Sequence, residues 1–191
     1  MAPRGTWRDA PGTMAMIVLL CAVFAFEVAR GAVGNERALL RLGAFPNNAV
    51  IGGQWWRVLT FAFLHLTWWH LLANVALLAW VGRIVETRLG SACWAAIYAA
   101  GLIVPGTMVL LVRTVAPKDG CTVGASGAIC ALLAAAIVAV RRHKRDRAVR
   151  RGLWACLAVT VALSFLPGVS LAGHAAGLLT GALLASIFAG L

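Results

Sequence analysis

Long apolar runs alternate with short polar or basic segments along nearly the whole chain. Hydrophobic residues make up 62% of the sequence and charged residues only 12%, whereas about a quarter of a soluble domain is charged. A bilayer core about 30 Å thick takes about 20 apolar residues in a helix, and a helix satisfies its own backbone hydrogen bonds there. The pattern predicts an all-α, polytopic membrane protein with six membrane-spanning helices. The expected spans are residues 14–29, 58–81, 91–112, 126–140, 153–166 and 172–191.

The chain is expected to form a single membrane domain, residues 14–191, after a short polar segment, residues 1–13. A cleaved signal peptide is the alternative for the first apolar run, because that run is short and small residues follow it. Its removal would leave five spans with a weaker charge pattern, so we favour six spans.

The positive charges indicate how the chain is oriented. Six spans put both termini on one side, and that side then holds eleven Lys and Arg residues against six on the other. The positive-inside rule therefore predicts cytoplasmic termini. The compact six-span form, without extra domains or a transit peptide, suggests a bacterial plasma (inner) membrane. Because the basic residues lie between apolar runs, we interpret the net charge of +11 as topology signals and contacts to anionic membrane lipid, and expect no nucleic-acid partner.

The cysteines give no sign of a metal site or of a disulfide framework. Their number is odd, most lie inside apolar runs, and no pair has the spacing of metal ligands. We therefore expect neither a bound metal nor structural disulfides.

Four polar residues fall at a similar depth near one end of the expected bundle. His70 and Asn74 lie within about the first two-thirds of the second span, Ser126 begins the fourth, and His174 is in the first turn of the sixth. The fourth span covers only about 22 Å as a helix, so Ser126 starts below the outer surface, beside a hydrated pocket. Taken singly, such residues are more often helix-packing or hydrogen-bonding groups. Their shared depth favours a functional site.

Small residues flank two of these positions. Gly124 and Gly127 flank Ser126, and glycines let another segment approach closely, while free N–H groups at a helix start can hold a developing negative charge. In the sixth span Gly173, Gly177 and Gly181 recur every four residues and form a groove beside His174, and the fourth span offers a complementary stripe of small residues. Packing the two stripes together is expected to bring Ser126 within hydrogen-bond distance of His174.

This pairing suggests acyl transfer, with His174 as the base for the Ser126 hydroxyl. His70 and Asn74 are four residues apart, so they share a helix face and can donate hydrogen bonds to an oxyanion. His65 lies about 140° round the helix from His70 and is interpreted as structural. Because no carboxylate falls in the fourth or sixth span, a Ser–His dyad is favoured over a Ser–His–Asp triad.

Ordered motifs in this chain resemble those of the rhomboid intramembrane serine proteases. They are Trp56-Arg57; His65-x4-His70-x3-Asn74 followed by Gly82 and Glu86; Gly124-x-Ser126-Gly127; and Gly173-His174-x2-Gly177-x3-Gly181. The resemblance implies a six-helix rhomboid-like bundle and a serine endopeptidase that cuts transmembrane segments of membrane proteins without a metal or cofactor. It implies Ser126 as nucleophile, His174 as general base, and an oxyanion site made by His70, Asn74 and the Ser126 N–H. Substrate access is implied beside the fifth span.

One position departs from the family pattern. Many members carry an aromatic residue one turn after the nucleophile, where it stacks on the base, and this chain has Cys130 there. A thiol does not replace a ring face, so His174 is expected to be either less rigidly oriented or held by another aromatic residue.

Two other classes of function compete with the protease. A non-catalytic rhomboid-like protein that binds membrane segments typically lacks the serine or the base, whereas both are present here. A small transporter or proton relay would use His70 and His174, but the chain has neither an intramembrane series of carboxylates nor obvious repeats.

Overall fold

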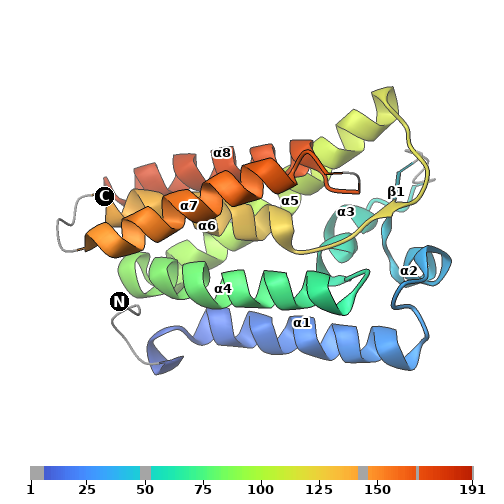
Figure 1. Ribbon diagram of the computed structural model, residues 1–191, viewed down its shortest axis with the longest axis horizontal. Coiled ribbons are helices and arrows are strands. Elements are labelled where there is room, and N and C mark those ends of the chain that lie inside the picture. Colours follow the sequence, from blue (N-terminus) through green and yellow to red (C-terminus); the bar gives the residue numbers. More distant parts are fainter. Residues whose placement is uncertain (1–6, 48–52, 142–145, 167, 191) are drawn as a thin grey trace.

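The computed structural model describes residues 7–47, 53–141, 146–166 and 168–190. Most of these residues belong to helices that lie roughly side by side (Figure 1). The helices are α1 Pro11–Ala29, α2 Glu36–Leu42, α3 Arg57–Thr60, α4 Trp68–Leu89, α5 Ser91–Val115, α6 Ser126–Val140, α7 Arg147–Leu163 and α8 Leu171–Phe188, with 3-10 turns η1 Trp7–Asp9 and η2 Phe61–Phe63. Two short strands, β1 Phe45–Pro46 and β2 Cys121–Thr122, pair antiparallel and join two loops at one end of the bundle.

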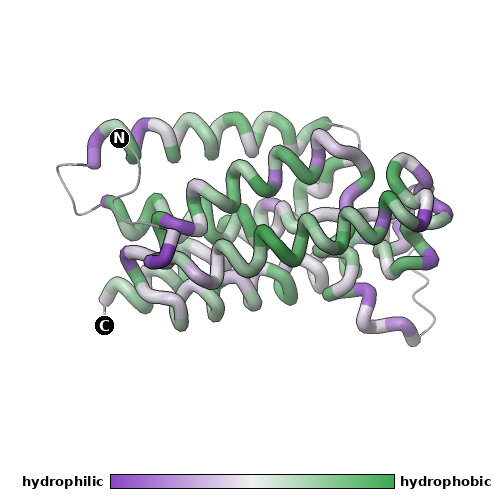
Figure 2. The backbone as a smooth tube through the Cα atoms, turned by 90° about the horizontal axis from the view of Figure 1, so that it is seen from below, coloured by the Kyte–Doolittle hydropathy of each residue, from purple (hydrophilic) through white to green (hydrophobic). Residues whose placement is uncertain are grey.

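Four helices of the described part are long and apolar enough to cross a membrane, namely α1, α4, α5 and α8. The sequence predicts six spans, and the other two correspond to shorter helices, α6 with 15 residues and α7 with 17. Most hydrophilic residues lie toward the two ends of the bundle, and the helices between them are largely hydrophobic (Figure 2). The chain is therefore an integral membrane protein.

The shorter apolar helix α6 occupies the centre of the bundle. It packs against α4, α5, α7 and α8, and every residue from Ala128 to Ala136 is buried. A helix surrounded by other helices does not need to match the bilayer thickness, because protein rather than lipid meets its ends. The start of α6 consequently lies inside the protein.

The crossing of α6 and α8 is a backbone-to-backbone contact. A Cβ atom added at Gly177 would overlap the carbonyl oxygen of Gly127, and one at Gly181 would overlap that of Ala131. The glycine groove of α8 thus receives the main chain of α6, as small-residue stripes in membrane helices allow. Gly173 does not take part in this crossing, because a Cβ atom added there would point toward Val109 of α5 and Ser170.

The predicted limits of the second span, 58–81, are wrong at both ends. The helix α4 begins at Trp68, where the extended residue Thr67 caps it by accepting a hydrogen bond from the His70 N–H at 3.2 Å. The preceding residues form the short helix α3 and the turn η2 instead. At the other end α4 continues to Leu89. The part of α4 beyond residue 81 includes the buried residue Glu86, which contacts the start of α1.

Glu86 explains why this polar end of α4 is buried. Its carboxylate accepts hydrogen bonds of 2.8 Å from the N–H groups of Gly12 and Thr13 and from the hydroxyls of Thr13 and Ser91. The residue before α1 supplies no side-chain cap, so Glu86 satisfies the free N–H groups at the start of that helix. One carboxylate therefore ties together the beginnings of α1 and α5 and the end of α4.

Replacement of Glu86 by glutamine is expected to destabilise the protein by about 2 kcal/mol, because the amide offers hydrogens where buried N–H groups need acceptors. The measurement is thermal or denaturant unfolding of the detergent-purified protein. The matched control is Glu36→Gln, an exposed residue in the first turn of α2, which is expected to change the free energy of unfolding by less than about 0.5 kcal/mol. Equal stability of the two variants would show that the Glu86 contacts do not stabilise the fold.

The remaining span limits differ less from the prediction. The first span begins at residue 11 rather than 14, the third ends at residue 115 rather than 112, and the sixth covers residues 171–188. The helix at the place of the predicted fifth span, 153–166, is α7, which starts at Arg147, inside the basic run. The fourth, 126–140, matches α6. Residues 1–6 of the N-terminal segment, 142–145 of the basic run and Leu191 lie outside the described residues.

The Arg57 side chain closes the long connection between α1 and α4. Its guanidinium donates to the backbone carbonyls of Leu40 at 2.7 Å and Ala44 at 2.8 Å, and to the Gln54 side chain. Leu40 lies in the last turn of α2, and Ala44 follows the end of that helix by two residues. The arginine thereby fixes the connection at the end of the bundle where α6 begins.

Candidate active site

The backbone before Ser126 requires a glycine. Gly124 has a φ of +118°, a conformation that residues with a Cβ rarely adopt, and its N–H donates to the Phe61 carbonyl at 2.9 Å. A Cβ atom at this position would also lie 2.6 Å from the His70 ring. Gly124 therefore leaves room for the His70 imidazole beside the segment that leads into Ser126, the first residue of α6.

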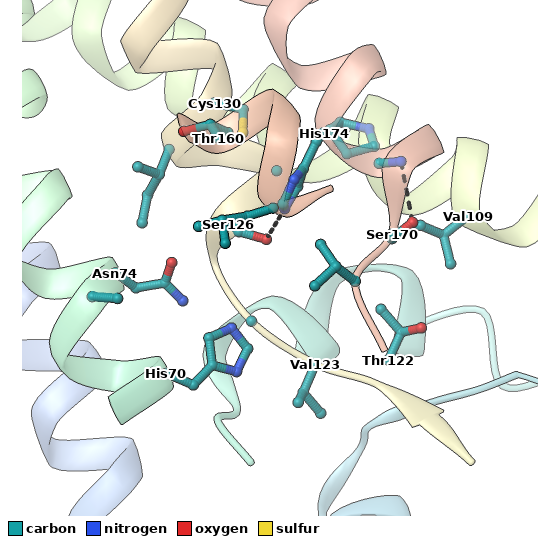
Figure 3. A pocket seen from close by; sticks show the side chains of 18 of the residues that line it. His70, Asn74, Val109, Thr122, Val123, Ser126, Cys130, Thr160, Ser170 and His174 are labelled. Atoms are coloured by element: carbon teal, nitrogen blue, oxygen red, sulfur yellow. Dashed lines mark hydrogen bonds between the residues drawn. The ribbon is translucent and has the colours of Figure 1, made fainter. Parts of the chain in front are cut away.

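The α6–α8 crossing brings Ser126 and His174 together. His174 lies in the first turn of α8, which Ser170 caps by accepting a hydrogen bond from the Gly173 N–H at 3.2 Å. The distance between His174 Nε2 and Ser126 Oγ is 2.8 Å (Figure 3). Residues 48 positions apart thus form a hydrogen-bonded serine–imidazole pair, the geometry that a base needs to take a proton from a hydroxyl.

The second nitrogen of His174 also has a partner. Its Nδ1 atom lies 2.7 Å from the Ser164 hydroxyl, which in turn lies 2.7 Å from the Thr160 carbonyl oxygen. Ser164 follows the last residue of α7 and is 3% exposed. The imidazole is therefore held between two hydroxyl groups, one from α6 and one from the end of α7.

His70 and Asn74 line the same pocket as Ser126 and His174 but approach it from α4 (Figure 3). In the described part of the chain, the Ser126 hydroxyl is bonded to His174 and to neither of them. The Asn74 amide nitrogen lies 3.0 Å from Nε2 of His65, a fully buried ring. Because an amide nitrogen carries two hydrogens, this bond orients Asn74 and leaves a second hydrogen for the pocket.

The pocket has a volume of about 230 Å³ and is bounded by α4 to α8 and by the loop before α6. It is large enough for several water molecules. Its polar walls come from His70, Asn74, Thr122, Ser126, Thr160, Ser170 and His174, and most of the others are apolar. Gly124, Gly127 and Gly173 also line it, whereas Gly177 and Gly181 lie outside it, along the α6–α8 crossing. None of the described residues that line the pocket is acidic.

A family model described as the Rhomboid domain matches residues 52–190, which include the pocket and all four motifs. The chain belongs to the rhomboid family. The relatives include the Rhomboid protease GluP of Bacillus subtilis (31% identical over 172 residues) and the Rhomboid-like protease 3 of Toxoplasma gondii (31% identical over 192 residues). Those alignments cover 88% and 92% of this chain and 33% and 72% of the relatives.

This rhomboid spans only part of several of its relatives. It covers a third of GluP and 44% of the mouse Rhomboid-related protein 4, to which it is 34% identical over 144 residues. The names of two of these relatives describe proteases.

The structure also locates Cys130, the position at which the sequence departs from many rhomboids. Its thiol is buried, and its Cβ atom packs against Gly177, where α6 and α8 cross. Among the described residues, no aromatic ring contacts His174. The ring is instead held through Nδ1 by a hydroxyl, which neither of the two sequence-based expectations foresaw.

Two contributors to the site are missing from the sequence-based set. Ser164 is not spaced at helical intervals from the other site residues. The only signal for it in the sequence is that it is a polar residue at the end of an apolar span. His65 was interpreted as structural, and its bond to Asn74 makes it the residue that orients a member of the site.

Proposed function

We propose that this rhomboid is an intramembrane serine endopeptidase that cleaves transmembrane segments of membrane proteins through a Ser126–His174 dyad. The observation that carries the proposal is the 2.8 Å contact between His174 Nε2 and Ser126 Oγ at the wall of a partly polar pocket. Membership of the family and relatives named as proteases support it. The chemistry needs neither a metal nor a cofactor, because the dyad supplies both the nucleophile and the base.

In the proposed reaction, His174 takes the hydroxyl proton of Ser126 while Oγ attacks the carbonyl carbon of the scissile peptide bond. His174 then gives this proton to the leaving amine, and the C–N bond breaks to leave an acyl-enzyme. Water from the pocket attacks the ester, again with His174 as base, and releases the new carboxyl terminus together with the free Ser126 hydroxyl.

The negative oxygen of the tetrahedral intermediate requires donors around it. We assign this role to the backbone N–H of Ser126, at the start of α6, and to the side chains of His70 and Asn74 across the pocket. Unpaired N–H groups at a helix start and fixed side-chain donors both stabilise such an oxyanion. The hydrogen bond from Asn74 to His65 supports the assignment, because it holds the amide at a fixed place in the pocket wall.

For the arrangement in the membrane we propose six crossings, with residues 14–191 as the membrane domain and both termini in the cytoplasm of a bacterium. Two observations support the placement of both termini on the cytoplasmic side. Both ends of the described chain lie at the same end of the bundle, which is also where α6 ends and α7 begins (Figure 1). Arg141, Arg147 and Arg150 lie around that junction, as the positive-inside rule expects for a cytoplasmic loop. Transmembrane substrates and the surrounding lipid are then the partners.

Reaction with a fluorophosphonate probe tests the dyad. The detergent-purified wild type is expected to be labelled, because an activated serine attacks phosphorus as it attacks a carbonyl, and Ser126→Ala and His174→Ala are expected to lose the label. Ser186→Ala, an exposed serine at the far end of α8, serves as the control and should be labelled like the wild type. A folded wild type that takes up no label would favour a non-catalytic protein that binds membrane segments.

A further inference from the structure

Ser164 is placed to act on His174 from the side opposite the nucleophile. It is buried, although α7 itself is mostly exposed. Its backbone N–H is anchored on the Thr160 carbonyl at 3.0 Å, and its hydroxyl lies 2.7 Å from that same carbonyl and 2.7 Å from His174 Nδ1. The position of the hydroxyl is thus set by the last turn of α7.

The number of hydrogens on each group determines which group donates and which accepts in these contacts. The Ser164 hydroxyl has one hydrogen, and the Thr160 carbonyl can only accept, so that hydrogen points to Thr160. The lone pair that faces His174 then accepts the hydrogen on Nδ1. A neutral imidazole with its hydrogen on Nδ1 has a free lone pair on Nε2. The Ser126 hydroxyl donates to that lone pair.

We propose that Ser164 is a positioning residue that holds His174 in the tautomer and the ring orientation in which Nε2 serves as the base for Ser126. The inference rests on the proposed function of the Ser126–His174 pair. In serine proteases with a triad an aspartate performs this task, whereas the described pocket walls contain no acidic residue. A neutral hydroxyl does so without the desolvation cost of a buried carboxylate.

The same contact also holds the protonated His174 ring that forms during the reaction. When His174 has taken the Ser126 proton, both ring nitrogens carry hydrogens and both need acceptors. The Ser164 oxygen remains an acceptor for Nδ1–H, so the ring keeps its place while Nε2 delivers its proton to the leaving amine. With Cys130 packed at Gly177 rather than on the ring, the hydroxyl is the contact that sets the ring angle.

The test compares Ser164→Ala, Ser164→Cys and Ser164→Thr with wild type. The readouts are the fluorophosphonate labelling rate and the kcat and KM for a transmembrane substrate in proteoliposomes. Alanine removes the acceptor, cysteine keeps the volume with a weak acceptor, and threonine keeps the hydroxyl. We expect Ala and Cys to lower both kcat and the labelling rate by about 10- to 100-fold with KM unchanged, less than the loss of about 10⁴ for a triad aspartate. Threonine is expected to restore most of the rate.

The control is Thr180→Ala, which removes a similar hydroxyl-to-carbonyl bond within α8, from Thr180 to the Ala176 carbonyl at 2.8 Å. It should label and cleave like the wild type. Wild-type labelling of Ser164→Ala or Ser164→Cys, with Ser126→Ala unlabelled, would overturn the role of Ser164 and leave the proposed function standing. An unlabelled wild type would overturn both. A change confined to KM or to the melting temperature would also reject a positioning role.

Discussion

The double variant Ser126→Ala/His174→Ala is expected to cleave no more slowly than either single variant, each of which should lose about 10⁴-fold or more in kcat. The reason is that the two side chains act as one unit across the 2.8 Å contact. Without the hydroxyl there is nothing for the imidazole to activate, and without the imidazole the hydroxyl is a weak nucleophile. The remaining rate would come from the oxyanion donors and from substrate binding alone.

The measurement is single-turnover cleavage of a transmembrane substrate by the wild type, both single variants and the double variant, reconstituted at equal concentration. Ser186→Ala again serves as the control for a serine outside the pocket. Two results would contradict the dyad: a His174→Ala variant within about tenfold of the wild type, or losses that multiply in the double variant. Multiplied losses would mean that the two residues contribute independently.

The contact between Ser126 and His174 could be predicted from the sequence because stripes of small residues indicate where two membrane helices cross closely. Glycines every four residues in α8 and the Gly127/Ala131 stripe of α6 allow the two backbones to touch, which sets the register of the two helices. Once the register is set, the residues at the helix starts must meet. The class of the fold was equally accessible, since long apolar runs between basic segments have few structural solutions.

The beginning of α4 could not be predicted in this way. Residues 58–67 are as apolar as the helix that follows, so hydropathy does not separate a span from a short helix and a turn packed beneath the loop before α6. The decisive local signal is Thr67, whose side chain caps α4. The other end of the helix was misjudged because Glu86 is charged, and its burial depends on donors from α1 that are more than 70 residues away.

The role suggested for Ser164 depends on geometry that the sequence does not record. Ser164 reaches His174 because α7 ends one residue before it and the chain then turns into α8. A shift of one residue in the end of α7 would turn the hydroxyl away from the ring. Periodicity finds residues on one helix face, whereas this contact joins the end of one helix to the start of the next.

Replacement of Gly181 by alanine is expected to destabilise the protein by about 3 kcal/mol, at the upper end of the usual cost of overpacking. The added Cβ would overlap the Ala131 carbonyl oxygen, which is backbone inside a helix and cannot move aside as a side chain does. The two helices must therefore separate. His174 lies two turns along α8 from Gly181, about 10 Å away, so the separation should also lengthen its contact with Ser126 and slow fluorophosphonate labelling.

Gly190→Ala is the matched control, because a Cβ there meets only ordinary contacts of 3.4 Å or more within its own helix end. Unfolding in detergent and the labelling rate should be measured for both variants. A lowered melting temperature together with slower labelling for Gly181→Ala alone would tie the close crossing of α6 and α8 to the Ser126–His174 contact. If Gly181→Ala lost stability but labelled at the wild-type rate, the dyad would be held by the Ser170 cap at the start of α8 and by Ser164 at the end of α7, and not by the crossing.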